Sequence, residues 1–378
     1  MKIGRMKAGR ASNPKTREED TDMEFGIQFF PDLGPEKKPA DKYWAEALHL
    51  VGLCDELGYT NVRTVEHYFT PYGGYTPNPH IFLAAASQRA KKARFTTGAI
   101  LPVFNHPLKV AAEIGMVDAI TGGRLECGFA RAFLPIEFTH FGVSLNESKE
   151  RFTEGMEIVR RLLEEEKVSY DGKFHKFQNV TSLPRPTQQP RPPFWVAALA
   201  TPESFENAGR MGYNIMAIPM GGGQMKGLLD TYRNAWRAGG HKGNGKIMLA
   251  FHMFCAQTHD EAVRISRDPL NRYLKSLVHA ASDWTTGTTS KDYAGYDKII
   301  AMLDKETWDT QIEKGAAWIG TPDEIRAQIA AYLPTTGGFD IASLQVNFNT
   351  VSVEDAERSM RLFSQKVMPH FVGKAKAA

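Results

Sequence analysis

Short apolar runs alternate with segments of helical periodicity along most of this chain. The apolar runs that predict β-strands are Glu24–Phe30, Asn61–Glu66, Phe95–Leu101, Arg124–Phe129, Phe194–Ala198, Asn214–Ile218, Lys246–Ala256 and Ile341–Asn347. The segments that predict helices are Asp41–Leu57, Pro79–Lys92, Pro107–Ile120, Asn146–Glu166, a stretch from near Pro202 to Gly212, Gln224–Ala238, His259–Ala280, Pro322–Tyr332 and Glu354–Met368. Strands that alternate with helices in this way form βα units around a parallel sheet.

The number of elements indicates how this sheet is organised. Eight strands with seven or eight helices predict an α/β fold of the (β/α)8, or TIM-barrel, type. A doubly wound open sheet is the alternative that the alternation leaves open. The G-x-G-x-x-G fingerprint that would favour that alternative is missing after the first strand.

Two segments depart from the alternation and are predicted to be insertions in the barrel. Val168–Val180 contains Asp171-Gly172 and predicts a β-hairpin with an Asp-Gly turn, placed after the fourth strand. Ser282–Lys314 has no barrel periodicity and is a candidate for a lid before the eighth strand, because long irregular segments in compact domains are often functional.

Composition sets the limits of the domain and of its partners. Residues 1–22 are basic and polar and lack the apolar stretch of a secretory signal, so we expect a flexible extension there and a single barrel domain over residues 23–378. The net charge of +3 is too balanced to indicate nucleic acid or an anionic membrane, and no apolar run approaches the ~18 residues of a membrane span. We expect a cytoplasmic protein.

His67 is the first candidate for chemistry. It follows the second predicted strand in Glu66-His67-Tyr68-Phe69, and a barrel assembles its active site at the carboxyl ends of its strands. Histidine exchanges a proton near neutral pH, and Glu66 is a candidate to orient or charge-stabilise the imidazole. Tyr68 and Phe69 are candidates for an apolar wall. A hydrogen-bonded core histidine is the alternative interpretation.

Three further strand ends bring residues suited to a phosphorylated, planar ligand. Gly98 and Ala99 are small enough to let the backbone approach a flat ring such as a flavin, although tight packing inside the barrel explains them equally well. Arg131, after the fourth strand, has the planar fork that binds phosphate, unless it is an ordinary surface arginine. After the fifth strand the chain runs into a helix N-terminus, where free N–H groups bind phosphate. The residues concerned are Ala198, Leu199, Ala200, Thr201 and Ser204.

Metal-dependent hydrolysis is the rival chemistry on this fold. It needs clustered histidine and carboxylate ligands at strand ends, but no H-x-H or H-x-x-E-H occurs and His252 is isolated on its strand. His106 precedes a helix-starting proline and is better explained as a loop or cap residue. No metal site is predicted.

Several motifs in a fixed order resemble the bacterial luciferase-like, flavin-dependent monooxygenase family. They are Phe25-Gly26, Glu66-His67-Tyr68-Phe69, Thr97-Gly98-Ala99-Ile100, His106-Pro107, Gly122-Gly123-Arg124, Ala130-Arg131, Tyr170-Asp171-Gly172-Lys173-Phe174, Pro190–Ala198 and Ile319-Gly320-Thr321-Pro322. The resemblance runs from about residue 23 to 370.

The resemblance implies a (β/α)8 barrel, usually a homodimer, that binds reduced FMN delivered by a separate flavin reductase. Oxygen would add to the flavin, and the C4a-(hydro)peroxyflavin would attack a small apolar or aromatic substrate. His67 would be the base beside the ring, Gly98-Ala99 a pair often joined by a cis peptide beneath it, and Arg131 the phosphate ligand together with the loop at Ala198–Thr201.

Departures from the luciferases limit what the resemblance implies. Ala198 and Leu199 stand where luciferases have acidic and hydroxyl residues, Ala130 where they have a reactive cysteine, and Tyr68 where they have a second histidine. Light emission is therefore not expected. Two other functions stay open: hydride transfer with the deazaflavin F420 on the same barrel, and a non-catalytic flavin-binding partner subunit.

Overall fold

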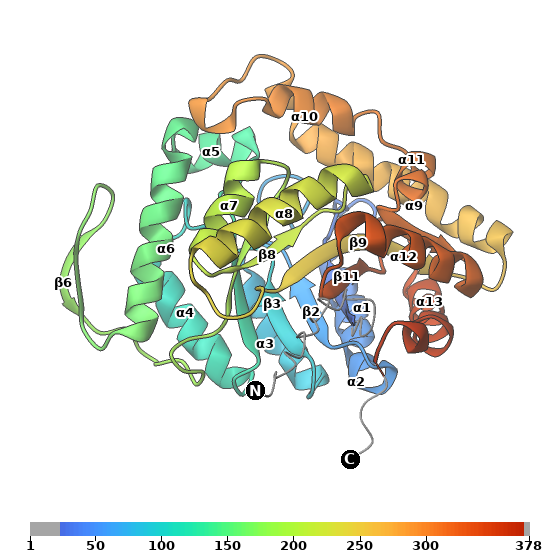
Figure 1. Cartoon of the computed structure of the whole chain (residues 1–378), viewed down its shortest axis with the longest axis horizontal. Helices are drawn as coiled ribbons and strands as arrows, with labels where there is room; N and C mark the ends of the chain where they lie inside the picture. The colour runs from blue at the N-terminus through green and yellow to red at the C-terminus, as the bar shows by residue number, and fades with distance from the viewer. Residues whose placement is uncertain (1–22, 374–378) are drawn as a thin grey trace, which may run out of the picture.

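A closed barrel of eight parallel strands forms the centre of the computed structural model, which describes residues 23–373 (Figure 1). Its strands are β1 (Glu24–Phe29), β2 (Asn61–Thr64), β3 (Arg94–Thr97), β4 (Leu125–Phe129), β7 (Phe194–Ala198), β8 (Asn214–Ala217), β9 (Ile247–Cys255) and β11 (Ile341–Gln345). Pairing of β9 with both β8 and β11 closes the ring. This confirms the TIM barrel and excludes the open sheet. The extension expected at 1–22 lies outside the described residues.

Helices surround this barrel, mostly where their periodicity predicts them. They are α1 (Ala40–Gly52), α2 (Cys54–Leu57), α3 (Pro79–Arg89), α4 (Pro107–Ile120), α5 (Pro135–Phe141), α6 (Ser148–Glu164), α7 (Pro202–Arg210), α8 (Gly222–Ala238), α9 (His259–Ala280), α10 (Tyr296–Leu303), α11 (Trp308–Glu313), α12 (Pro322–Thr336) and α13 (Val353–Lys366). The helix predicted over Asp41–Leu57 is interrupted at Leu53. The helices α5, α10 and α11 were not predicted, and neither was the strand β10 (Ala317–Gly320), which pairs with the second half of β9.

Local sequence signals fix where several of these helices begin. Proline occupies the first turn of α3, α4, α5, α7 and α12, where its missing N–H breaks no helical hydrogen bond. Thr321 and Glu324 form a capping box at the start of α12, and Gly337 ends that helix in the left-handed conformation.

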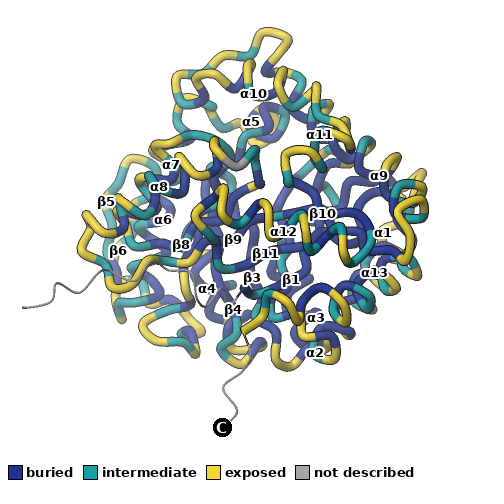
Figure 2. The backbone as a smooth tube through the Cα atoms, turned by 45° about the vertical axis from the view of Figure 1, so that its right-hand side comes forward, coloured by how far each residue is buried: buried dark blue, intermediate teal, exposed yellow. Residues whose placement is uncertain are grey.

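The barrel interior is filled near the amino ends of the strands and accessible nearer their carboxyl ends. Trp195, Met216, Met248 and Ile341 pack together as a buried layer, and the indole of Trp195 donates to Glu126 at 2.9 Å. Two residues further along their strands, Ala197 and Ala250 are partly exposed, whereas the strands around them are otherwise buried (Figure 2). The inner face therefore opens to solvent on the side where barrel enzymes act.

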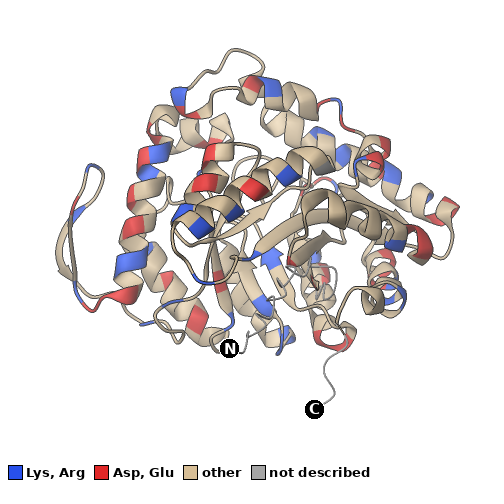
Figure 3. Cartoon of the chain, in the orientation of Figure 1, with Lys and Arg blue, Asp and Glu red and all other residues tan. Residues whose placement is uncertain are grey.

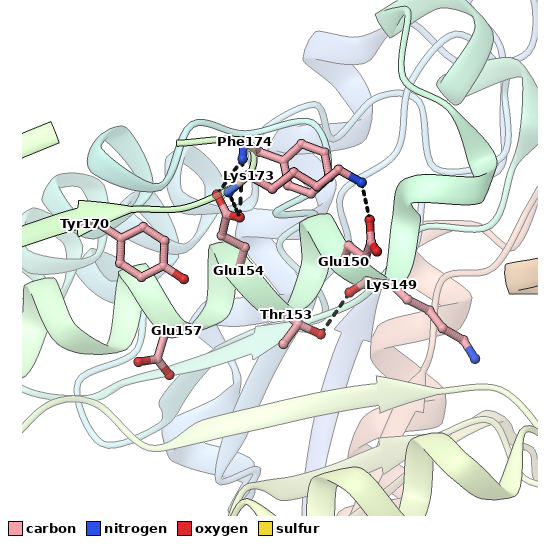
Figure 4. Close-up of a pocket in the computed structure, with 8 residues that line it drawn as sticks. All are labelled: Lys149, Glu150, Thr153, Glu154, Glu157, Tyr170, Lys173 and Phe174. Carbon is pink, nitrogen blue, oxygen red and sulfur yellow. Dashed lines mark hydrogen bonds and ion pairs between the residues drawn. The ribbon is translucent and has the colours of Figure 1, made fainter. Parts of the chain in front are cut away.

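The hairpin after β4 is present, but its turn differs from the prediction. β5 (Val168–Asp171) and β6 (Lys176–Val180) are joined by the four residues 172–175 rather than by a two-residue Asp-Gly turn. The carboxylate of Glu154 on α6 accepts hydrogen bonds from the backbone N–H groups of Lys173 and Phe174 (Figure 4). It also accepts one from the N–H of His175 and so holds this wider loop. The hollow of about 640 Å³ beside it is lined by α6 and the hairpin.

Charged residues of both signs alternate along the outer helices, α6 included (Figure 3). On α6, Arg160 pairs with Glu164 at 2.6 Å and Arg161 with Glu165 at 2.8 Å, one helical turn apart. No helix within residues 23–373 is long and apolar enough to cross a membrane.

Candidate active site at the carboxyl ends of the strands

His67 lies just past β2 and is held by a carboxylate from another segment. The residue is only 8% exposed, and its Nδ1 is 2.9 Å from Oε1 of Glu137 on α5, which is fully buried. The backbone N–H of Tyr68 donates to the same oxygen at 3.0 Å. Because a carboxylate only accepts hydrogen bonds, we assign the ring proton to Nδ1, which leaves Nε2 as the proton acceptor.

The partner expected for His67 was wrong. Glu66 points to a different set of donors: the Tyr68 hydroxyl and the Asn105 amide, both at 2.6 Å, and the backbone N–H of Leu101 at 3.2 Å. Burial raises the pKa of Glu66 to about 7 against the lowering effect of these donors. Glu66 and His67 therefore contact different groups although they are adjacent in the sequence.

The aromatic wall beside His67 also differs from the expected one. The rings of Phe30, Tyr72 and Phe133 lie 5.4–6.0 Å from the imidazole. Tyr68 instead stacks edge-on against Phe141 of α5, and Phe69 is 54% exposed. The residues directly after the histidine thus lie farther out, whereas Phe30 and Phe133 from other segments, together with Tyr72 of the same loop, supply its immediate surroundings.

The loop after His67 reaches back over the imidazole. Gly73 has a φ of 78°, and a Cβ at this position would lie 2.6 Å from the Cβ of His67. Its N–H donates to the carbonyl of Pro31 at 2.6 Å. Only glycine fits this close approach and this backbone conformation.

Gly98 and Ala99 follow β3 and are joined by a cis peptide, as the family resemblance implied. The carbonyl of Gly98 accepts a hydrogen bond of 2.9 Å from the guanidinium of Arg63 on β2. A Cβ added to Gly98 would overlap the Nε of Arg63. The absence of a side chain at this position therefore makes room for the arginine.

Arg131 follows β4 and lies under aromatic residues of the segment predicted to be a lid. Its guanidinium is 4.4 Å from the ring centre of Tyr293, whose hydroxyl donates to the carbonyls of Arg131 and Ala132 at 3.1 and 2.9 Å. Burial raises the pKa of the Tyr296 phenol, and the neighbouring side chains of Arg131 and Thr201 act to lower it. The insertion thus brings two predicted phosphate ligands together.

The chain after β7 passes through Ala198, Leu199 and Ala200 into the N-terminus of α7. Thr201 is the N-cap residue, but its side chain does not cap the helix and lies beside Tyr296. The N–H of Ser204 donates to the carbonyl of Thr201 at 2.9 Å. No side chain caps the first turn of α7, so no cap competes with an anion there, although the N–H of Ser204 is already bonded.

Ring contacts connect the imidazole to this anion-binding end. Phe133 is 6.0 Å from His67 and 6.5 Å from Tyr296, between ring centres. Tyr296 in turn contacts Arg131 and Thr201. One wall of side chains thus runs from His67 through Phe133 and Tyr296 to Arg131 and Thr201. It combines an oriented base, an aromatic surface, and an arginine beside a helix N-terminus. We call it the His67–Thr201 wall.

The other histidines considered in the sequence lie outside this wall. His106 is the N-cap of α4 and accepts the N–H of Leu108 at 3.3 Å, which confirms its cap assignment. His252 is buried with its Nε2 unpartnered, and burial lowers its pKa to about 3, so it stays neutral. No group of three potential metal ligands occurs in the part of the chain that the structure describes.

Sequence reasoning missed Glu137, Arg63 and the two lid tyrosines. A weak signal existed for Glu137, since Pro135 and Gly142 bracket a short helix start and end. Arg63 was visible as the single charge inside the strand Asn61–Thr64. Nothing in the sequence marks Tyr293 or Tyr296 among the chain's 12 tyrosines.

Comparison with known proteins gives consistent matches over most of the chain. Residues 23–338 match a family described as luciferase-like monooxygenase. The crystal structure of the monooxygenase RslO1 from Streptomyces bottropensis superposes with a TM-score of 0.82 at 41% identity, covering 92% of this chain and 100% of that one. The oxygenase component of a flavin-dependent trigonelline monooxygenase from Acinetobacter baylyi is 28% identical over 92% of this chain and 96% of its own length. An uncharacterized protein, y4wF, of Sinorhizobium fredii is 34% identical over 52% of this chain, which matches only 56% of that relative's length.

Proposed function

The chain belongs to the luciferase-like monooxygenase family, and from that premise we propose that it is the oxygenase of a two-component system. In this proposal it receives reduced FMN from a flavin reductase and uses O2 to oxygenate a small apolar or aromatic molecule. The trigonelline monooxygenase relative is itself named an oxygenase component, which supports a separate reductase for this chain. We also propose a homodimer built from the single barrel domain.

The observation that carries this proposal is the His67–Thr201 wall. At one end, Arg131 and the uncapped start of α7 fit a phosphate, because a guanidinium fork and free helical N–H groups both favour a dianion. At the other end, His67 offers Nε2 to a reacting group. Arg131, Thr201 and Ser204 would hold the FMN phosphate, and Gly98 and Ala99 would lie against its ring. Bound reduced FMN supplies the electrons that activate oxygen.

The chain's own contribution is orientation, proton handling and exclusion of water. Glu137 fixes the imidazole of His67 through Nδ1, so that Nε2 takes or returns a proton at one defined position. Phe30, Tyr72 and Phe133 surround the imidazole with apolar surface and limit the access of water. The same rings favour an apolar or aromatic substrate.

Anaerobic titration of the purified protein with reduced FMN, followed by mixing with O2 and candidate aromatic substrates, tests this function. We expect binding of reduced FMN and reductase-dependent oxygenation. His67→Ala is expected to lower turnover by about 10²–10⁴-fold, the usual contribution of a general acid–base. His106→Ala, which removes a histidine that only caps α4, is the matched control and is expected to retain activity.

Two results would contradict the proposal and point to the alternatives. Binding of F420 without binding of reduced FMN would indicate hydride transfer on the same barrel. Binding of FMN without turnover by the wild-type protein would indicate a flavin-binding partner subunit.

A further inference from the structure

A second cationic group lies inside the barrel, on a strand two positions from the one that Arg131 follows. Arg63 is on β2, and its side chain reaches the carbonyl of Gly98 at 2.9 Å and the side-chain oxygen of Gln28 on β1. Its Nε is buried and has no hydrogen-bond partner. The residue as a whole is partly exposed, on the inner face that opens toward the carboxyl ends of the strands.

Arg63 has no counter-charge among residues 23–373. Both groups that receive its hydrogen bonds are neutral carbonyl oxygens, and no carboxylate lies within ion-pair distance of its guanidinium. The titratable groups that affect its pKa are two buried phenols, Tyr72 and Tyr273. Burial raises the pKa of each phenol, so both are neutral near pH 7 and supply no negative charge. Burial lowers the pKa of Arg63 only to about 10, which leaves it protonated.

An unpaired charge in such a place is unfavourable unless a ligand compensates it. Other arginines without an ion pair, such as Arg124, spread their N–H groups over several backbone carbonyls. Arg63 donates two of its five N–H groups to protein oxygens, and the others have no acceptor among the described residues. Removing a guanidinium from water costs several kcal/mol. A ligand that brings negative charge close to Arg63 would offset this cost, so the inner face of the barrel favours binding of such a ligand.

The chemistry of flavin suggests which charge this is, on the assumption that the proposed function holds. The reduced isoalloxazine ring readily loses a proton near neutral pH and spreads the negative charge over its N1–C2=O edge, whereas the oxidised ring is neutral. The phosphate has the same charge in both redox states. A cation near N1 is a general means by which proteins adjust flavin electronics.

We propose that Arg63, oriented by Gln28 and the carbonyl of Gly98, is the group that makes this barrel prefer the reduced, anionic flavin ring over the oxidised one. Arg131 and Arg63 then divide the work of binding: Arg131 recognises the phosphate in either redox state, and Arg63 recognises the charge that only reduction creates. An oxygenase that depends on a separate reductase needs this preference, because it must take up reduced flavin and release oxidised flavin.

Anaerobic measurement of the dissociation constants for reduced and oxidised FMN, on the full chain, tests this division. Arg63→Gln is expected to raise the dissociation constant of reduced FMN by about tenfold to a hundredfold, the effect of losing one charge-assisted contact. The dissociation constant of oxidised FMN is expected to change by less than about threefold. Arg63→Lys, which keeps the charge, is expected to restore part of the preference. Arg131→Gln is the matched control and is expected to weaken the binding of reduced and oxidised FMN by the same factor.

The alternatives give different results in the same experiment. If Arg63→Gln loses affinity equally for reduced and oxidised FMN, or loses affinity for neither, the proposal is overturned. It is also overturned if the flavin preference is unchanged and only the KM for acidic substrates rises. If Arg63→Gln does not fold, the comparison of Arg63→Lys with the wild type for both redox forms decides. Failure of the wild-type protein to bind reduced FMN would instead refute the proposed function itself.

Discussion

Replacement of Glu137 tests whether α5 is what orients His67. In Glu137→Ala two hydrogen bonds to Oε1 are lost, at 2.9 Å from the imidazole and 3.0 Å from the N–H of Tyr68. Hydrogen bonds to a charged acceptor contribute about 1.5–3 kcal/mol each, and removal of a buried carboxylate also removes its own desolvation cost. The net loss of unfolding free energy is therefore expected to be roughly 2–4 kcal/mol. In Glu137→Gln the amide oxygen keeps both contacts, so the loss is expected to stay below about 1.5 kcal/mol.

Urea unfolding followed by tryptophan fluorescence measures these differences, and reduced-FMN turnover is recorded on the same samples. Glu137→Gln is expected to keep the imidazole in place but to lower turnover, because its neutral amide no longer stabilises the charged imidazole. Glu137→Ala is expected to lower turnover further. Equal stability of the Ala and Gln variants, together with unchanged turnover in both, would refute the role of Glu137 in holding His67.

Three further predictions follow from the packing of the site. Tyr293→Phe removes two hydrogen bonds to the backbone carbonyls of Arg131 and Ala132. Because each such bond is worth about 1 kcal/mol, the variant is expected to bind FMN about threefold to tenfold more weakly. Fluorescence titration measures this affinity, and an unchanged affinity would contradict the prediction. Burial raises the pKa of Asp32 from 3.8 to about 7. Between these values the folded state keeps a proton that the unfolded state has lost, so the unfolding free energy is expected to fall as pH rises across this window, by up to about 4 kcal/mol, and Asp32→Asn is expected to flatten the profile measured by urea unfolding. Gly98→Ala places a Cβ on the Nε of Arg63 and is expected to reduce the preference for reduced FMN. A redox titration of the bound flavin measures this preference. A reduction potential equal to that of the wild type would contradict the prediction.

The alternation of apolar runs and helical segments was enough to identify all eight barrel strands. Period and length distinguish strands from helices locally, and prolines and glycines mark helix ends, as at α4 and α12. β10 was missed because it follows an irregular segment and only pairs with the second half of β9, which a local pattern does not show, and α5 because seven residues make barely two turns. The hairpin was predicted, but its turn was not, because Glu154 on α6 holds the loop from outside the hairpin.

The sequence by itself determined that this chain forms a barrel and that His67, Gly98 and Arg131 come at the ends of its strands, because those properties depend on local pattern and order. It could not determine that Glu137, 70 residues away, holds His67, or that Tyr293 reaches the backbone of Arg131 across 162 residues. Nor could it show that Arg63 lacks a counter-charge. Compensation of charges and hydrogen bonds depends on which loops meet over the barrel, and only closure of the sheet brings those loops together.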